Sequence, residues 1–333
     1  MTPPGALEVW APDGIGEVVP ADDLAALVWH HARPETGDIV VITSKIVSKA
    51  EGRLRRGPVA ASLAAETERV LARTGSIIIV KGRLGITQAM AGLDASNVAL
   101  GTHALLPLDP DASAQQVRAS LWDRETVNIG VLISDTAGRA WRIGQTEIAI
   151  GAAGVLLTED FRGREDGYGH ALTRTEPCVA DELCNAAELV QGKIGRRPIA
   201  RIRGRADLVC APGMPGVPAA SLNRPDDHDL FGLGATEAVL RALRALPEDL
   251  SAFGTPATAE VLAQALERVV PGTWVEREGT TPDRVVATMS EPHQAVVVRA
   301  VAFAHGWYSD AGEPAPSPLR HLTLVPRSLR DSP

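Results

Sequence analysis

Ile129-Gly130-Val131-Leu132-Ile133-Ser134-Asp135-Thr136-Ala137-Gly138-Arg139 is the stretch that decides the fold. Its first five residues form a short apolar run with β-branched side chains, which predicts a strand buried inside a sheet. Ser134 and Asp135 then signal a turn at the end of that strand. Because α/β proteins commonly bind ligands where their strands end, Asp135 and Thr136 are candidate site residues.

A second acidic segment, Leu93-Asp94-Ala95-Ser96-Asn97, has the same chemistry, with a carboxylate beside hydroxyl and amide groups. Two such segments together offer the oxygen ligands that a hard divalent cation prefers. Either segment alone is most simply explained as an ordinary Asx-type turn. The interpretation as a metal site therefore depends on what the rest of the chain contributes.

A pair of lysines follows another predicted buried strand. Residues 39–42 are almost entirely apolar, as expected of a strand covered on both faces, and Thr43-Ser44-Lys45 comes directly after it. Lys45 and Lys49 are well placed to bind phosphate, although they are equally consistent with surface lysines at a helix start. Neither G-x-x-x-x-G-K-[ST] nor G-x-G-x-x-G occurs, so a nucleotide site would need a different architecture.

Periodicity predicts an alternation of strands and helices along the chain. Further strands are expected at 7–10, 77–81, 199–203, 273–277, 284–289 and 322–325. Helices are expected at 24–31, 60–73, 112–124, 179–190, 236–246, 258–269 and 294–305, with Asp111 capping the third. A composition shift near 247–255 divides the chain into a domain over 1–247 and a small α/β segment over 251–333, whose end from 314 is expected to fray.

Composition and charge exclude several classes of protein. The 333 residues suffice for about two domains, and a net charge of −8 argues against a broad surface for nucleic acid or anionic membrane. No apolar run approaches a membrane span, and the N-terminus lacks the features of a signal peptide. Cys178, Cys184 and Cys210 lack the spacing of a disulfide framework or a zinc site, and are typical of reduced thiols in a cytoplasmic protein.

Several polar groups have two interpretations. The arginines at 53–56 and 196–205 are either solvated or part of an anion site. Glu182 and Glu188 are most simply solvated charges on a helix face. His170 lies in a polar, Gly-rich segment at 159–169 that we expect to be a mobile loop, and is more often an ordinary loop histidine than a functional one.

Long strings of the sequence resemble one family. Segments 37–53, 91–98, 134–142 and 148–151 are similar, in order, to the coenzyme F420-0:L-glutamate ligases, or gamma-glutamyl ligases. Residues 179–193 and 229–234 fit as well, so the similarity spans about 7–246. The resemblance implies an α+β fold, with a mixed-sheet ligase domain followed here by the small α/β segment, and an intertwined homodimer.

The resemblance also implies a chemistry. GTP would phosphorylate a carboxylate of F420-0, and the amine of L-glutamate would displace the phosphate to form an amide, with gamma-linked extension of the tail. Asp94 and Asp135 would hold one divalent cation, Mg²⁺ or Mn²⁺, and Thr136 a second, with K⁺ as a further candidate ion. Contacts to GTP are implied for Gly14, Ile15, Gly16, Glu17, Ser44, Lys45, Lys49 and Asn97. The loop at 191–193 would close over the nucleotide.

The chain departs from the family pattern at a few places. Gly82-Arg83-Leu84-Gly85, Met90 and Ala137 replace other residues at positions expected on the floor of the site. Residues 251–333 do not match the nitroreductase-like flavin domain of some relatives, so FMN is not expected. Two alternatives stay open, an amide ligase for another carboxylate and a non-catalytic relative that binds nucleotide. Retention of Asp94, Asn97, Asp135 and Thr136 together argues against the second.

Overall fold

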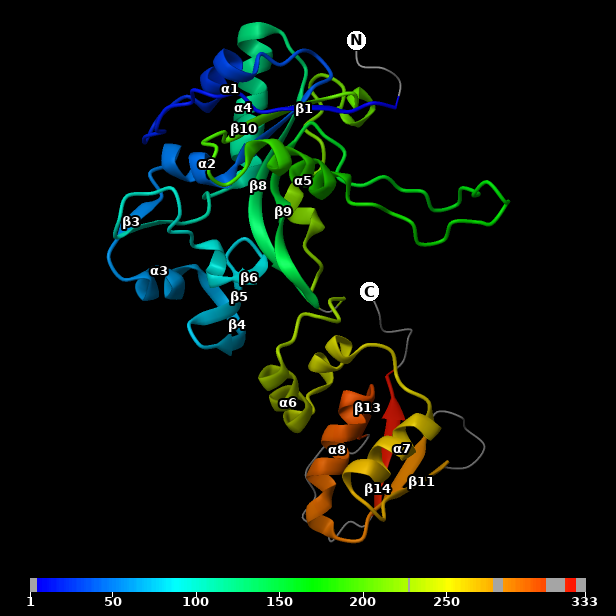
Figure 1. Cartoon of the computed structure of the whole chain (residues 1–333). Coiled ribbons are helices and arrows are strands. Elements are labelled where there is room, and N and C mark those ends of the chain that lie inside the picture. The colour runs from blue at the N-terminus through cyan, green and yellow to red at the C-terminus, as the bar shows by residue number, and fades with distance from the viewer. Residues whose placement is uncertain (1–4, 227, 278–283, 310–320, 328–333) are drawn as a thin grey trace. The chain divides into compact units, whose positions relative to one another are not determined.

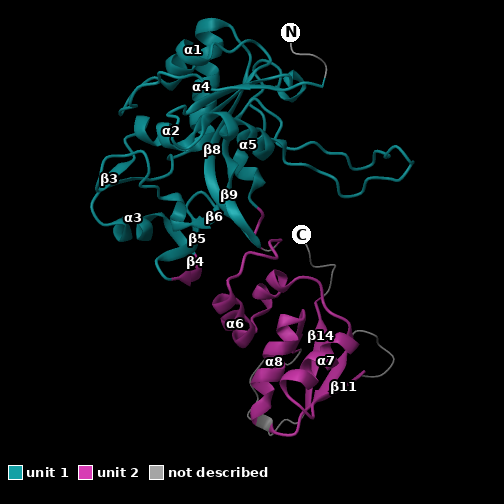
Figure 2. Cartoon of the chain, viewed as in Figure 1, with its two compact units in different colours: residues 1–69, 75–223 teal, residues 70–74, 224–333 magenta. Residues whose placement is uncertain are grey.

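The computed structural model describes residues 5–226, 228–277, 284–309 and 321–327. The chain forms two compact units (Figure 2), one of residues 1–69 and 75–223 and the other of residues 70–74 and 224–333. The division into domains at 247–251 stays a prediction, because compactness alone does not show which part folds by itself. Of the end expected to fray, 314–333, all but 321–327 lies outside the described residues.

Figure 1 labels most of the helices and strands. Up to residue 222 they are, in chain order, β1 (Glu8–Trp10), α1 (Leu24–Ala32), β2 (Ile39–Thr43), α2 (Ser44–Ala50), β3 (Leu54–Arg56), α3 (Val59–Glu66), β4 (Thr67–Thr74), β5 (Ile77–Gly82), β6 (Thr87–Ala89), η1 (Met90–Gly92), β7 (Thr102–Ala104), α4 (Pro110–Glu125), β8 (Gly130–Arg139), β9 (Arg142–Ala153), α5 (Val179–Gln191), β10 (Ile199–Arg203), η2 (Ala206–Leu208) and η3 (Ala219–Leu222).

The first unit is built on a mixed five-stranded sheet of order β1-β10-β2-β8-β9. Only β2 and β8 run parallel in it, and the other neighbours are antiparallel. Two further small sheets pair β3 with β7, and β4, β5 and β6 in that order. This mixture of parallel and antiparallel pairing with separate helices confirms the α+β class.

Helices cover both faces of the five-stranded sheet. On one face Val40, Ile42 and Val131 pack against α1 and α4, and on the other Val41 and Leu132 pack against α5. Burial on both faces explains why β2 is apolar at every position rather than at alternate ones. The central strands are thereby fixed, and their polar ends emerge beside α2 and α5.

A β-bulge changes the register of the β8–β9 hairpin. Ile133 lies opposite Gly151, but Ser134 lies opposite Ala149, so Ile150 is the extra residue on β9. Side chains alternate between the two faces along a strand, and one extra residue reverses that alternation. Ala152 accordingly lies on the α5 face of the sheet, whereas Ile150 lies on the α1 and α4 face.

Two predictions about element ends were wrong. The strand from Ile129 does not end in a turn at Ser134 and Asp135, because β8 continues to Arg139 along its partner β9. The helix expected over 60–73 ends at Glu66 and continues as β4. Glu66 is held there by Arg53 and Arg83, each at 2.8 Å, a tertiary interaction that periodicity cannot show.

The N-cap of α4 was also predicted wrongly. Asp109, and not Asp111, accepts the hydrogen bond that caps the helix, from the backbone N–H of Ala112. Asp111 instead accepts N–H groups from Ala152 and Ala219. A sequence with two aspartates only two positions apart does not reveal which one caps the helix.

The segment around His170 has no regular secondary structure. Backbone hydrogen bonds join Phe161 to Thr175 and Gly163 to Leu172, so the two arms run side by side in a long excursion visible in Figure 1. The mobility expected of residues 159–169 stays a prediction.

The second unit is a small α/β structure, as expected for residues 251–333. It contains α6 (Ala235–Arg244), η4 (Pro247–Phe253), α7 (Ala259–Val269), β11 (Trp274–Arg277), β12 (Val285–Thr288), η5 (Pro292–Gln294), α8 (Ala295–Ala304), β13 (Trp307–Ser309) and β14 (His321–Pro326). The strands form an antiparallel sheet of order β11-β12-β14-β13, and Leu262, Leu266 and Val298 pack α7 and α8 against it. None of the described helices is both long and apolar enough to cross a bilayer.

Candidate functional site

A cavity of about 610 Å³ lies where β2 ends and α2 begins, beside β8 and the C-terminal end of α5. We call it the central cavity. It brings together almost every residue that the sequence suggested: Ile15, Gly16, Glu17, Ser44, Lys45, Lys49, Asp94, Asn97, Asp135 and Thr136 all line it. Gly14 does not, although its φ of +82° places it at the turn that leads into this wall.

Asp94 is bound by Lys45, which lies in the first turn of α2. The Lys45 Nζ donates to Asp94 Oδ2 at 2.5 Å and to the carbonyl and hydroxyl oxygens of Ser96 at 2.8 and 2.6 Å. Partial burial opposes ionisation of Asp94, but the hydrogen bonds from Lys45 and Ser96 outweigh it, so the pKa of this carboxyl lies below its ordinary value. Asp94 is therefore an anion whose present counter-ion is a side-chain ammonium group.

Fewer groups stabilise the negative charge of Asp135 than that of Asp94. Asp135 Oδ1 accepts a hydrogen bond of 2.8 Å from the Ser44 hydroxyl, and within the described residues the Asp135 carboxylate forms no ion pair. Burial in the cavity, reinforced by the nearby charges of Glu147 and Asp94, raises the pKa of Asp135 to about 7. Titratable groups perturbed in this way are typical of functional sites, because the site holds more negative charge than it can stabilise unaided.

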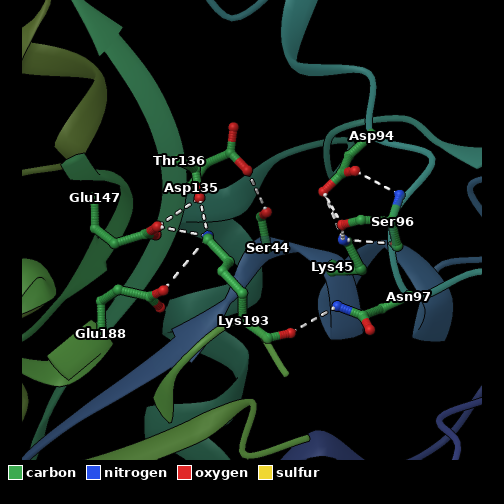
Figure 3. A network of polar contacts seen from close by, with 10 residues as sticks. All are labelled: Ser44, Lys45, Asp94, Ser96, Asn97, Asp135, Thr136, Glu147, Glu188 and Lys193. Carbon is green, nitrogen blue, oxygen red and sulfur yellow. Dashed lines mark hydrogen bonds and ion pairs between the residues drawn. The ribbon is translucent and has the colours of Figure 1, made fainter. Parts of the chain in front are cut away.

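Thr136 faces the opposite side of the sheet from Asp135, because neighbours in a strand alternate. It lies opposite Glu147 in the β8–β9 ladder, and its hydroxyl donates to Glu147 Oε1 at 2.5 Å. The Lys193 Nζ contacts Thr136 Oγ1 and lies 3.1 Å from Glu147 Oε1 and 3.6 Å from Glu188 Oε1 (Figure 3). Glu147 is 4% exposed, and Asn185 holds its backbone with two hydrogen bonds.

The remaining wall of the cavity is basic. The Lys49 ammonium group forms an ion pair with the exposed carboxylate of Glu17 at 2.5 Å, and the Arg197 guanidinium donates to Asp13 Oδ1 at 2.7 Å. Arg196 also lines the cavity, in the left-handed conformation at φ 54°. The cavity therefore has an acidic side and a basic side, which suits a ligand that carries both phosphates and metal ions.

Several of these residues were missed or misjudged from the sequence. Glu147 was not a candidate, because only the register of β9 places it beside Thr136. Glu188, expected to be a solvated charge, lines the cavity, where burial and the charge of Glu147 raise its pKa. Of the basic run at 196–205, Arg196 and Arg197 line the cavity, whereas Arg203 is bound to Asp38 at 2.7 Å.

The departures from the family pattern lie elsewhere. Arg83 binds Glu66 and the carbonyl oxygen of Leu108, Met90 packs in a small cluster with Leu63 and Val80, and Ala137 is buried. None of Arg83, Met90 and Ala137 lines the central cavity. The expectation that they form its floor is therefore wrong.

Comparison with known proteins agrees with the resemblance. Residues 14–69 and 57–204 match the model of the F420-0:gamma-glutamyl ligase family. The chain is 38% identical over 208 residues to the coenzyme F420:L-glutamate ligase of Archaeoglobus fulgidus, which covers 57% of this chain and 84% of that protein. It is 41% identical over 197 residues to that of Methanopyrus kandleri, covering 53% and 78%. The chain belongs to the F420-0:gamma-glutamyl ligase family.

Proposed function

We propose that this protein joins L-glutamate to coenzyme F420-0 through an amide bond, using GTP to activate the carboxylate as an acyl phosphate, and that it extends the tail through gamma linkages. The observation that carries the proposal is the convergence of Asp94, Asp135, Lys45 and Lys49, from three separate segments, on one cavity. Family membership supplies the reaction class, and the cavity supplies groups suited to each reactant.

The chemistry explains why both signs of charge are needed. A carboxylate is a poor acyl donor, because its leaving group would be oxide, whereas an acyl phosphate releases phosphate. To form one, an anionic carboxylate must approach an anionic phosphate. Lys49 and Arg196 on the basic wall would bind and orient the phosphates, and Lys45 would move from Asp94 toward them when Asp94 finds another counter-ion.

The acidic side fits a divalent cation. Asp94 and Asp135 offer carboxylate oxygens for one cation, and the Thr136 hydroxyl, on the other side of the sheet, offers an oxygen for a second. The buried Ser134 hydroxyl has no hydrogen-bond partner among the described residues. Those residues contain no ready-made group of three His, Cys, Asp or Glu for a metal ion, so phosphate oxygens would complete the coordination. Divalent cations held by these residues would neutralise charge on both reactants. Mg²⁺ or Mn²⁺ as the ion, K⁺ as a further one, a homodimer and a cytoplasmic location stay predictions.

The direct test is an assay with F420-0, L-glutamate, GTP and Mg²⁺ or Mn²⁺, read by the masses of the products. A ladder in glutamate steps supports the proposal and gives the tail length. Hydrolysis of GTP without a glutamylated product would favour another acceptor carboxylate, and neither product nor hydrolysis would favour a non-catalytic relative. The variant Asp135→Asn should lose turnover, whereas Asp123→Asn, at an exposed position of α4, should keep it.

A further inference from the structure

A second cavity, of about 590 Å³, lies in the first unit along the free edge of the five-stranded sheet. β9 is the last strand of that sheet, and the cavity is bounded by β9, the loop between β5 and β6, the starts of α4 and α5, and η3. We call it the edge cavity. None of the residues that line it lines the central cavity, so it is distinct from the site proposed for GTP and the metal ions.

The edge of β9 beside this cavity is closed to a further strand. The backbone N–H of Ala149 donates to Asp181 Oδ1 and that of Ala152 donates to Asp111 Oδ1, each at 2.8 Å. A peptide that extended the sheet would need these N–H groups as donors. The edge cavity therefore suits a small molecule, and its volume lies within the range of cavities that hold one.

The wall of the edge cavity is mainly apolar, and its charged groups already have partners. Arg83, the one basic residue among the described residues that line it, is bound by Glu66 at 2.8 Å. The Asp111 carboxylate accepts three backbone N–H groups. Such a wall does not suit a polyphosphate and favours a largely uncharged ligand such as a planar ring system. The large apolar side chains on it are those of Leu84, Ile86, Ile148, Ile150 and Leu222.

The edge cavity adjoins the central cavity across one pair of residues. Ile148, on the wall of the edge cavity, is the ladder partner of Asp135, on the wall of the central cavity. Directly paired residues of an antiparallel ladder share a face of the sheet, and their Cβ atoms lie about 5 Å apart. A ligand whose reacting group lies beside Asp135 therefore has the edge cavity within the reach of a short linker.

We propose that the edge cavity binds the ring system of the acceptor, while the carboxylate of the acceptor lies beside Asp135 in the central cavity. The inference rests on the proposed function, in which that carboxylate must reach GTP. F420-0 carries its carboxylate on an arm attached to a planar heteroaromatic ring system, so its two ends need a polar site and an apolar one. Asp181 and Asn223, on the wall of the edge cavity, offer oxygens to N–H and hydroxyl groups of such a ligand.

The test fills the edge cavity and measures which substrate responds. Ala220 lies on its wall and is exposed, so the indole of Ala220→Trp would occupy part of the cavity. We expect the KM for F420-0, and its Kd measured by the fluorescence of the ring system, to rise about tenfold or more. The KM values for GTP and L-glutamate should stay within about twofold of those of the parent chain.

Two further variants complete the comparison. Leu222→Ala removes apolar contact area without adding bulk, and should raise the KM and the Kd for F420-0 about threefold to thirtyfold. Ala119→Trp, at an exposed position of α4 outside both cavities, is the matched control and should change neither value.

A truncated acceptor separates the ring site from the reacting groups. 2-Phospholactate carries the reacting carboxylate without the ring system. The parent chain should use it with a kcat/KM at least about a hundredfold lower than that for F420-0, and Ala220→Trp should not lower that value further.

Three outcomes would overturn the inference. An unchanged KM and Kd for F420-0 in both Ala220→Trp and Leu222→Ala would place the ring system elsewhere, and the proposed function would stand without the inference. An equal loss of kcat/KM for F420-0 and 2-phospholactate would show that the substitution acts on the reacting groups and not on a ring site. If the parent chain neither binds nor glutamylates F420-0, the proposed function fails, and the inference with it.

Discussion

Asp135→Asn should make the metal-free protein more stable at high pH while abolishing its turnover. In the folded chain the pKa of Asp135 is about 7, against an ordinary value of 3.8. Below pH 3.8 the carboxyl is protonated in both the folded and the unfolded chain, so its ionisation contributes nothing. Between the two values only the unfolded chain ionises, so the free energy of unfolding of the parent chain falls as pH rises, and this loss is complete above about pH 7.

The size of the effect follows from the same difference. A change from 3.8 to about 7 corresponds to about 4 kcal/mol for a fully desolvated carboxyl. Asp135 keeps some solvent contact through the cavity, so we expect about 2 kcal/mol. Asparagine removes the charge, and its Oδ1 can still accept the hydrogen bond from Ser44. The variant should therefore match the parent at pH 4 and exceed it at pH 8.

The assay is urea unfolding of both chains at pH 4, 6 and 8 with EDTA present. Asp123→Asn, which removes an exposed carboxylate, should show no trend with pH. A difference between Asp135→Asn and the parent that is the same at every pH would refute the reasoning, and so would a variant that is less stable at pH 8.

Three further predictions concern the cavity and the fold. Lys49→Ala should raise the KM for GTP about tenfold to a hundredfold, and steady-state kinetics should show no such change for Lys81→Ala outside the cavity. EDTA should stop turnover, and added Mn²⁺ should restore it. In Asp94→Asn the rate after Mn²⁺ is added should be at least about a hundredfold lower than in the parent chain. Full activity in EDTA would contradict the metal proposal. Gly154→Ala should lower the free energy of unfolding in urea by about 2 to 4 kcal/mol, because φ is +64° and the new Cβ would lie 2.0 Å from Nε of Arg118. Arg118 cannot easily move away, since it is hydrogen-bonded to Ile129, Met214 and Asn128. Gly138→Ala, with open space around the new Cβ, is the control and should cost far less.

Local patterns in the sequence predicted most of the elements and the acidic and basic residues of the cavity. Ile39 to Ile42 and the run from Ile129 are strands because they are apolar throughout, and the lysines after the first of them do line the cavity. The strand after α3 could not be predicted, because Glu66 ends that helix through contacts with Arg53 and Arg83.

What the sequence could not provide was pairing across strands. Glu147 lies eleven positions from Thr136, and nothing in that spacing shows that the two side chains share one face. The partner of each lysine, Asp94 for Lys45 and Glu17 for Lys49, likewise depends on loops that meet only in the folded chain.

The bulge at Ile150 has a consequence for how this cavity can be altered. If Ile150 were instead paired opposite Ser134 in a regular ladder, Glu147 would lie opposite Ala137, and Thr136 opposite Ile148. Glu147 would then share a face with Asp135, and three carboxylates would crowd the α2 side while the α5 side lost its buried one. A change that abolished the bulge but kept Ile150 would thus transfer a charge across the sheet without changing any charged residue, whereas deletion of Ile150 itself would leave Glu147 opposite Thr136. The register of β9 decides which carboxylates lie on each side of the sheet. A design that transplants the cavity must therefore copy the bulge together with the acidic residues.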